Sequence, residues 1–162
     1  MPTVFVLDTS YLCELYRVPG FHRAELPAQI EERIQIRAGD RFYVPLGCLY
    51  ELCDHIGDVA DGGRRHEIAG QVVSDVETSL EDAFPWVIVP AADVEHELLR
   101  LLRAFSDDSV RLEMGLTDST VISEAERLKR KYPASLGYRV HIWTTDTTLK
   151  AYEPDREHDP LL

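Results

Sequence analysis

The sequence predicts an α/β fold in which helices cover a parallel sheet. Three observations lead to this prediction: four short apolar runs have the length of strands, segments with helical spacing separate them, and the first run shows no polar alternation. A strand without alternation is buried on both faces, as in a parallel sheet covered by helices. The chain has 162 residues, enough for one sizeable core, so we predict a single domain.

The four predicted strands are rich in aliphatic, β-branched and aromatic residues. They are VFVL at residues 4–7, RFYV at 41–44, WVIV at 86–89 and YRVHIWT at 138–144. The first strand ends abruptly in Asp8, and the last is followed closely by Asp146. Because ligands bind at the carboxyl ends of strands in open α/β sheets, both acids are candidate site residues.

Helices are predicted where apolar residues recur at spacings of three and four. They cover residues 11–16, 24–38, 45–56, 64–84, 94–105, 115–131 and 147–152. The segment at about 57–84 begins with the glycine-rich sequence GDVADGG and is interpreted as a helical insertion or hairpin. We therefore expect one domain over residues 1–153, followed by a polar tail at 154–162.

Composition limits the class of protein. The net charge of −12, from 29 acids and 17 Lys and Arg, argues against promiscuous binding of nucleic acid. No apolar run approaches about 20 residues and the start does not resemble a signal peptide, so we expect a soluble, cytoplasmic protein without membrane contact. The three cysteines, Cys13, Cys48 and Cys53, lack zinc-like spacing and are expected to be buried thiols.

Two further acids lie on predicted helices. Asp118 follows Gly115 at the start of a helix, on the same side as Ile122, so its carboxylate is expected to point inward. Glu51 lies off the expected apolar stripe of its helix, which comprises Leu46, Leu49, Tyr50, Cys53 and Ile56, and faces either solvent or a cleft. Helix capping would account for Asp8, Asp118 and Asp146 one by one, but it does not account for Glu51.

The shared setting of these acids suggests a cation site. Two carboxylates 5 Å apart repel each other by about 3 kcal/mol at an effective dielectric constant near 20. A cluster of carboxylates therefore needs a cation, or some members must take up protons. Ligands that are all oxygen favour Mg²⁺ or Mn²⁺ over zinc.

Four segments together resemble the PIN domain, a nuclease family that includes VapC-like toxins. They are VFVLDTSYL with Asp8, VPLGCLYEL with Glu51, GLTDSTVISEA with Asp118, and IWTTDTTL with Thr144 and Asp146. The resemblance implies a three-layer fold with a parallel sheet of four to five strands. It also implies cleavage of RNA that depends on a divalent metal, with the four acids as ligands and Ser10 and Thr144 as supporting hydroxyls. The chain departs from the compact toxins in its length between Glu51 and Trp86 and in its acidity.

The resemblance also implies partners. VapC-like proteins pair as homodimers, and an antitoxin inhibits them by inserting a basic side chain among the metal-site acids. Within this chain, Arg64 and Arg65 beside the glycine-rich loop are the candidate RNA contacts, through phosphate. The function expected is that of a metal-dependent endoribonuclease, either free-standing or the toxin of a toxin–antitoxin pair.

Two other classes of function compete with this expectation. In a non-catalytic PIN-like binding module the acids would serve only as helix caps, although a scaffold does not need the complete acidic set. A phosphoryl-transfer domain with Asp8 as phosphate acceptor would need a second acid near the first and a lysine at a later strand end. Residues 7–10 read LDTS and the last strand ends in TTD, so this class ranks third.

Overall fold

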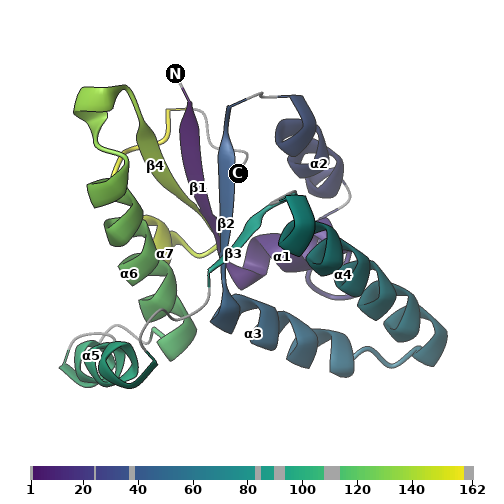
Figure 1. Cartoon of the computed structure of the whole chain (residues 1–162). Coiled ribbons are helices and arrows are strands. Elements are labelled where there is room, and N and C mark those ends of the chain that lie inside the picture. The colour runs from purple at the N-terminus through teal and green to yellow at the C-terminus, as the bar shows by residue number, and fades with distance from the viewer. Residues whose placement is uncertain are drawn as a thin grey trace.

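Four parallel strands form the centre of the molecule (Figure 1). A computed structural model describes residues 2–23, 25–36, 39–82, 85–89, 94–107 and 114–158. The strands lie in the order β3-β2-β1-β4 and comprise Thr3–Leu7 (β1), Arg41–Pro45 (β2), Val87–Val89 (β3) and Arg139–Trp143 (β4). This arrangement confirms the predicted α/β class and its parallel sheet.

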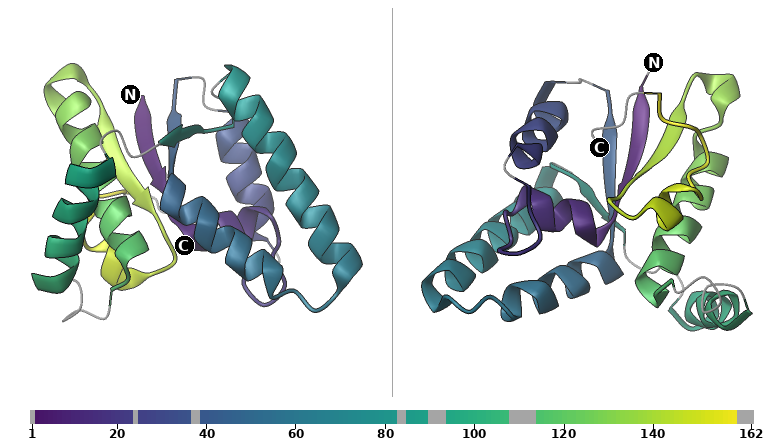
Figure 2. Two further views of the ribbon diagram at one scale, coloured as in Figure 1. Left: turned by 60° about the horizontal axis from the view of Figure 1, so that its bottom comes forward. Right: turned by 180° about the vertical axis from the view of Figure 1, so that it is seen from behind.

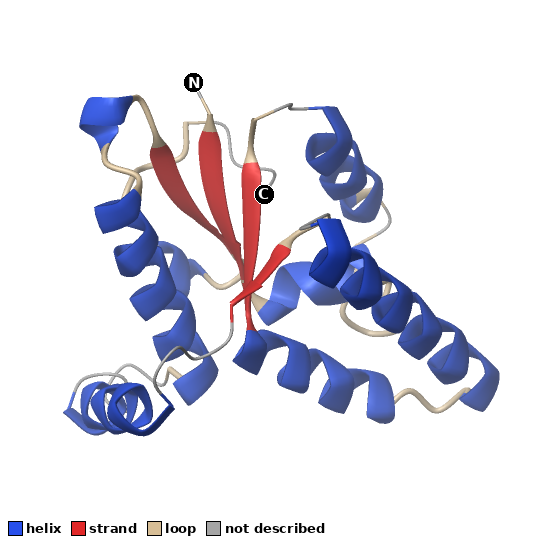
Figure 3. Ribbon diagram, in the orientation of Figure 1, coloured by secondary structure: helices blue, strands red, loops and turns tan. Residues whose placement is uncertain are grey.

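Helices flank the sheet, as Figure 3 shows. Their bounds are Thr9–Leu15 (α1), Leu26–Ile36 (α2), Leu46–Gly57 (α3), Gly62–Asp82 (α4), Val94–Asp107 (α5), Leu116–Lys131 (α6) and Thr147–Lys150 (α7). The predicted helix ends at residues 24, 38 and 84, and the tail after residue 158, lie outside the described residues. Within the described ranges, no helix is both long enough and apolar enough to cross a membrane.

The two faces of the sheet carry different helices. Phe5 pairs in register with Phe42, and its ring packs 4.4 Å from that of Trp143. On this face the guanidinium of Arg33 from α2 lies 5.1 Å from the centre of the Phe5 ring. Tyr43 points to the opposite face, because successive strand residues alternate, and there its hydroxyl lies 3.0 Å from that of Tyr132 at the end of α6. Both faces are thus covered, as an all-parallel sheet requires.

The α3 and α4 helices form a hairpin that extends away from the sheet (Figure 2). Helix α3 begins at the carboxyl end of β2, whereas α4 begins at the far tip of the hairpin (Figure 1). Arg65 fixes this tip, since its Nη1 donates hydrogen bonds to the carbonyls of Val59 at 2.9 Å and Gly57 at 3.5 Å. The arginine therefore supplies donors at the end of α3.

The apolar stripe predicted for α3 was wrong in part. Its buried side chains are those of Cys48, Leu49, Leu52 and Ile56, while Cys53 is exposed and Tyr50 has 65% of its surface exposed. The sequence contains two overlapping stripes at helical spacing, and packing against α1, α4 and β2 selects the one centred on Leu52. The prediction of buried thiols holds for Cys13 and Cys48 but not for Cys53.

Candidate functional site

Two hydroxyls hold the ends of β1 and β4 together around Asp8. Asp8 Oδ2 accepts hydrogen bonds from Ser10 Oγ at 2.7 Å and from Thr144 Oγ1 at 2.9 Å. The same hydroxyls accept hydrogen bonds from the chain after β4: Ser10 Oγ from the Thr145 N–H at 2.9 Å, and Thr144 Oγ1 from the Asp146 N–H at 3.0 Å. We call this arrangement the strand-end clamp. It gives Ser10 and Thr144 a positioning role toward Asp8.

The clamp holds a carboxylate that is almost removed from water. Asp8 has only 6% of its surface exposed. Burial raises the pKa of Asp8 above its ordinary value, and the hydrogen bonds from Ser10 and Thr144 offset part of this rise. A nearby cation would lower the free-energy cost of keeping Asp8 ionised.

Glu51 and Asp118 reach the same edge of the sheet from two helices. Glu51 Oε2 accepts a hydrogen bond from Thr9 Oγ1 at 2.8 Å, which connects α3 to the first residue of α1. Asp118 Oδ2 accepts a hydrogen bond from the Gly115 N–H at 2.7 Å in the first turn of α6. The N-cap residue of this helix is Gly115, and Asp118 lies in its first turn. Glu51 is half-buried, and its bond to Thr9 turns its carboxylate toward the start of α1.

The electrostatics around Asp118 show that the four acids converge. Burial is the largest cause of its raised pKa, and the negative charges of Asp8, Asp146 and Glu51 raise that pKa further. Such an effect requires all three carboxylates to lie near Asp118, although they come from separate segments of the chain. The structure thus brings Asp8, Glu51, Asp118 and Asp146 to one edge of the sheet, while their function as metal ligands remains a prediction.

Each of the four acids also has a local structural partner. Asp8 caps α1, and Asp146 caps α7 by accepting hydrogen bonds from the N–H groups of Thr148 at 2.6 Å and Leu149 at 3.2 Å. Asp118 completes the first turn of α6, and Glu51 bonds to Thr9. Capping accounts for three acids individually, but not for their convergence.

The four acids are not close enough together for three of them to hold one ion directly. Among the residues that the structure describes, no three of these acids bring ligand atoms within 4.8 Å of one another. Mg²⁺ usually keeps several waters and binds directly to one or two carboxylates. A Mg²⁺ or Mn²⁺ ion, which favours oxygen ligands such as these, would therefore be held directly by at most two of the four acids.

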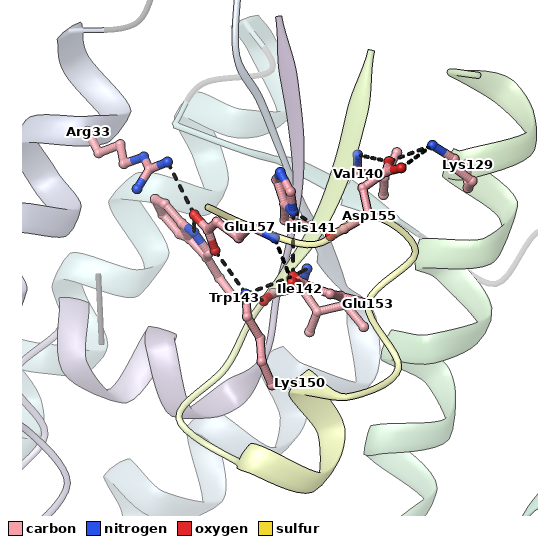
Figure 4. A network of polar contacts seen from close by, with 10 residues as sticks. All are labelled: Arg33, Lys129, Val140, His141, Ile142, Trp143, Lys150, Glu153, Asp155 and Glu157. Atoms are coloured by element: carbon pink, nitrogen blue, oxygen red, sulfur yellow. Dashed lines mark hydrogen bonds and ion pairs between the residues drawn. The ribbon is translucent and has the colours of Figure 1, made fainter. Parts of the chain in front are cut away.

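A second polar group lies along β4, at the outer edge of the sheet (Figure 4). The Val140 N–H donates to Asp155 Oδ2 at 2.8 Å, and the Asp155 N–H donates to the Val140 carbonyl at 3.2 Å. The Ile142 N–H donates to Glu153 Oε2 at 3.4 Å, and the Ile142 carbonyl accepts from Lys150 Nζ at 2.8 Å. Residues 153–158, which we call the C-terminal strap, thus pack against β4, where the sequence predicted only a polar tail.

This group contains three side chains of the kind that bind metal ions, and their ligand atoms lie within 4.8 Å of one another. They belong to His141, Glu153 and Glu157. The position between the carboxylates is taken by Lys150 Nζ, 2.7 Å from Glu153 Oε2 and 2.8 Å from Glu157 Oε2. Arg33 lies 3.2 Å from Glu157 Oε1. Burial alone would raise the pKa of Glu153, but hydrogen bonds from His141 and Lys150 lower that pKa to about 2. Because two protein cations already balance these acids, the group is a structural ion-pair network.

The two arginines predicted to contact RNA lie away from the four acids. Arg64 Nη1 pairs with Glu67 Oε2 at 2.7 Å, and Arg64 lines a cavity of about 560 Å³ between α1, α2 and α4 to which none of the four acids contributes. Arg65 is bonded to the end of α3. Both residues belong to the first turn of α4, and this helix begins at the tip of the hairpin (Figure 2). The glycine-rich loop that suggested an RNA contact serves as the turn of this hairpin.

Comparisons with known proteins leave the family open. A scan of the chain against known protein families finds no match, and a search of curated proteins finds no relative. The resemblance to the PIN domain thus rests on the four sequence segments.

Proposed function

We propose that this protein is a divalent-metal-dependent ribonuclease that hydrolyses RNA phosphodiester bonds at the four acids. One observation carries the proposal: Asp8, Glu51, Asp118 and Asp146 converge at the carboxyl edge of a parallel sheet, where the pKa of Asp118 is raised by burial and by the other three charges. This edge is where open α/β sheets bind ligands. The order of the four segments, which is that of the PIN domain, supports the same assignment.

The residues of the site have distinct tasks in this proposal. A bound Mg²⁺ or Mn²⁺ would polarise the phosphodiester and generate a hydroxide-like nucleophile from a bound water. Asp8 would hold the ion, and the Ser10 and Thr144 hydroxyls fix the orientation of its carboxylate. Thr9 holds Glu51 in the same way. Asp118 and Asp146 complete the negative field that attracts the cation.

The test compares cleavage with metal binding in matched variants. RNA and DNA oligonucleotides are incubated with wild-type protein in Mg²⁺, in Mn²⁺ and in chelator, and then with Asp8→Asn and Asp118→Asn. We expect cleavage of RNA only with metal and no cleavage by either variant. Asp54→Asn is the control, because Asp54 is an exposed acid on the same helix as Glu51. This control should cleave like wild type.

Thermal unfolding gives a readout that does not depend on activity. Mg²⁺ should stabilise wild-type protein and Asp54→Asn, but Asp118→Asn much less, because a ligand that binds only the folded state raises its stability. Without metal, Asp118→Asn should be as stable as wild type or more stable, since one repelling charge is gone. Cleavage that persists in both site variants, or in chelator, would refute the proposal.

A non-catalytic binding module is the second candidate, and one observation favours it. Three of the four acids have helix-capping or first-turn hydrogen bonds that are sufficient structural reasons for their presence. In that case, Mg²⁺ would not shift the unfolding temperature and no nucleic acid would be cleaved. Thermal unfolding with and without Mg²⁺ therefore separates the ribonuclease from the binding module before any substrate is chosen.

The partners implied by the PIN resemblance remain predictions. A homodimer would be detected by light scattering at micromolar concentration. A cognate antitoxin would place an arginine among Glu51, Asp118 and Asp146, where charge-assisted hydrogen bonds could replace the metal. Co-purification from the native host tests that partner, and recovery of active protein alone would leave a free-standing ribonuclease.

A further inference from the structure

The aromatic side chain of Tyr50, the residue before Glu51 in α3, is exposed. With 65% of its surface exposed, Tyr50 is the most exposed aromatic residue in the described part of the chain; Phe21 follows at 49% and Tyr152 at 43%. Its helix buries four other side chains, so the ring is not needed to attach α3 to the core. The face of the ring is available to a ligand.

Helix geometry places this ring at the edge of the candidate site. A Cβ atom on Gly47 would lie 3.6 Å from Thr120 Oγ1, so this side of α3 faces α6. An α-helix turns by about 100° per residue. Viewed along the axis of α3, Tyr50 therefore lies about 60° to one side of Gly47 and Glu51 lies about 40° to the other side, both about one turn further along the helix. Long helical side chains lean toward the helix N-terminus, which for α3 is the carboxyl edge of the sheet. Tyr50 and Glu51 thus flank the line along which α3 meets α6.

The charge of the protein determines what kind of contact would hold RNA here. The net charge of −12 repels a polyanion at long range, and Arg64 and Arg65 are bound to protein partners at the tip of the hairpin. Stacking of a base on an aromatic ring does not depend on phosphate charge. It requires an unpaired base that can leave the stack, which single-stranded RNA offers and a duplex does not.

We propose that Tyr50 is a positioning residue that stacks a base of single-stranded RNA next to the scissile phosphate. This inference rests on the proposed ribonuclease function and assigns one substrate-binding residue to it. The ring would hold one nucleotide beside α3 while Glu51, one residue further along, faces the metal site. Loss of the ring should weaken substrate binding and leave the metal site intact.

Steady-state cleavage of a single-stranded RNA oligonucleotide in Mn²⁺ tests the inference. We expect Tyr50→Ala to raise KM roughly 5- to 150-fold, the range for one lost stacking contact, with a much smaller change in kcat. Tyr50→Phe and Tyr50→Trp keep a ring and should keep KM within about twofold of wild type. Tyr152→Ala is the matched control, because Tyr152 is also exposed but follows α7. Its KM should not change.

Two companion measurements separate the possible failures. Fluorescence anisotropy in chelator reports RNA binding without cleavage, and Tyr50→Ala should weaken binding of single-stranded RNA while leaving the slope of log Kd against log salt unchanged. Urea unfolding should give Tyr50→Ala the midpoint of wild type, because the ring is exposed. If wild type cleaves and Tyr50→Ala has an unchanged KM, the stacking role is refuted and the ribonuclease stands. If wild type neither cleaves nor binds RNA, both proposals are refuted.

Discussion

Thr144→Val tests the strand-end clamp without reference to function. Valine has nearly the shape of threonine, so the substitution removes hydrogen bonds and leaves no cavity. The lost bond to the buried Asp8 carboxylate, at 2.9 Å, is worth about 1.5–3 kcal/mol as a bond to a charged group. The Asp146 N–H, at 3.0 Å from Thr144 Oγ1, belongs to an exposed residue and can bond to water instead. We therefore expect a loss of about 1.5–3 kcal/mol in the free energy of unfolding.

The assay is urea unfolding at several pH values. With a slope of about 2 kcal/mol per molar urea, the midpoint should fall by roughly 0.75–1.5 M at neutral pH. A hydroxyl donor favours the ionised form of Asp8, so its loss raises the pKa of Asp8 further in the folded state. Asp8 in the folded variant then keeps its proton to higher pH than in wild type. The difference in unfolding free energy between wild type and variant should therefore grow as pH rises through the folded pKa of Asp8, and should be smaller below that pKa.

Thr78→Val is the matched control. Thr78 is exposed on α4 and its hydroxyl donates to the Ser74 carbonyl at 3.0 Å, so its loss should change stability by less than about 0.5 kcal/mol. A Thr144→Val deficit as small as that of this control, or one that does not vary with pH, would refute the clamp as a source of stability.

Three further predictions concern the rest of the molecule. Arg65→Met should cost about 1 kcal/mol in urea unfolding by removing donors at the end of α3, and should leave RNA cleavage unchanged; slower cleavage would restore Arg65 as an RNA contact. Glu157→Ala should cost about 3 kcal/mol in thermal or urea unfolding, because it removes the buried carboxylate that pairs with both Arg33 and Lys150, and a cost under 1 kcal/mol would contradict that network. Glu153 has a folded pKa of about 2, below its unfolded value of 4.5, so its contribution is complete above pH 4.5 and is lost as pH falls toward 2. Glu153→Gln should therefore reduce stability at pH 6 but much less at pH 2, and a deficit that is equal at both would be inconsistent with this pKa.

The strands could be predicted because they are short apolar runs with clear ends. Val4 to Leu7 are fully buried, as the absence of polar alternation indicated. The rotation of α3 could not be predicted, because both the stripe with Tyr50 and the stripe with Leu52 have helical spacing. Which side of a helix is buried depends on neighbours that local periodicity does not specify.

The convergence of the four acids followed from topology. Asp8 and Asp146 succeed strands that pair in parallel, so both must lie at the same edge of the sheet. The bond from Thr9 to Glu51 was missed, because the two residues are 42 positions apart and nothing in either segment signals the contact. The bonds from Arg65 to the end of α3 were not foreseen, because a basic pair beside a glycine-rich loop indicates phosphate binding and helix capping equally well.

The C-terminal strap determines where the chain can be shortened. β4 is an edge strand, and an open edge can pair with strands of other molecules. Here the outward N–H and C=O groups of Val140 and Ile142 are all bonded to the strap or to Lys150. A protein cut after residue 152 would look like an intact domain by sequence, yet it would offer three unpaired backbone groups, the N–H and C=O of Val140 and the N–H of Ile142, as a template for intermolecular β-pairing. Such a truncated protein should aggregate through β4 while its four acids remain in place.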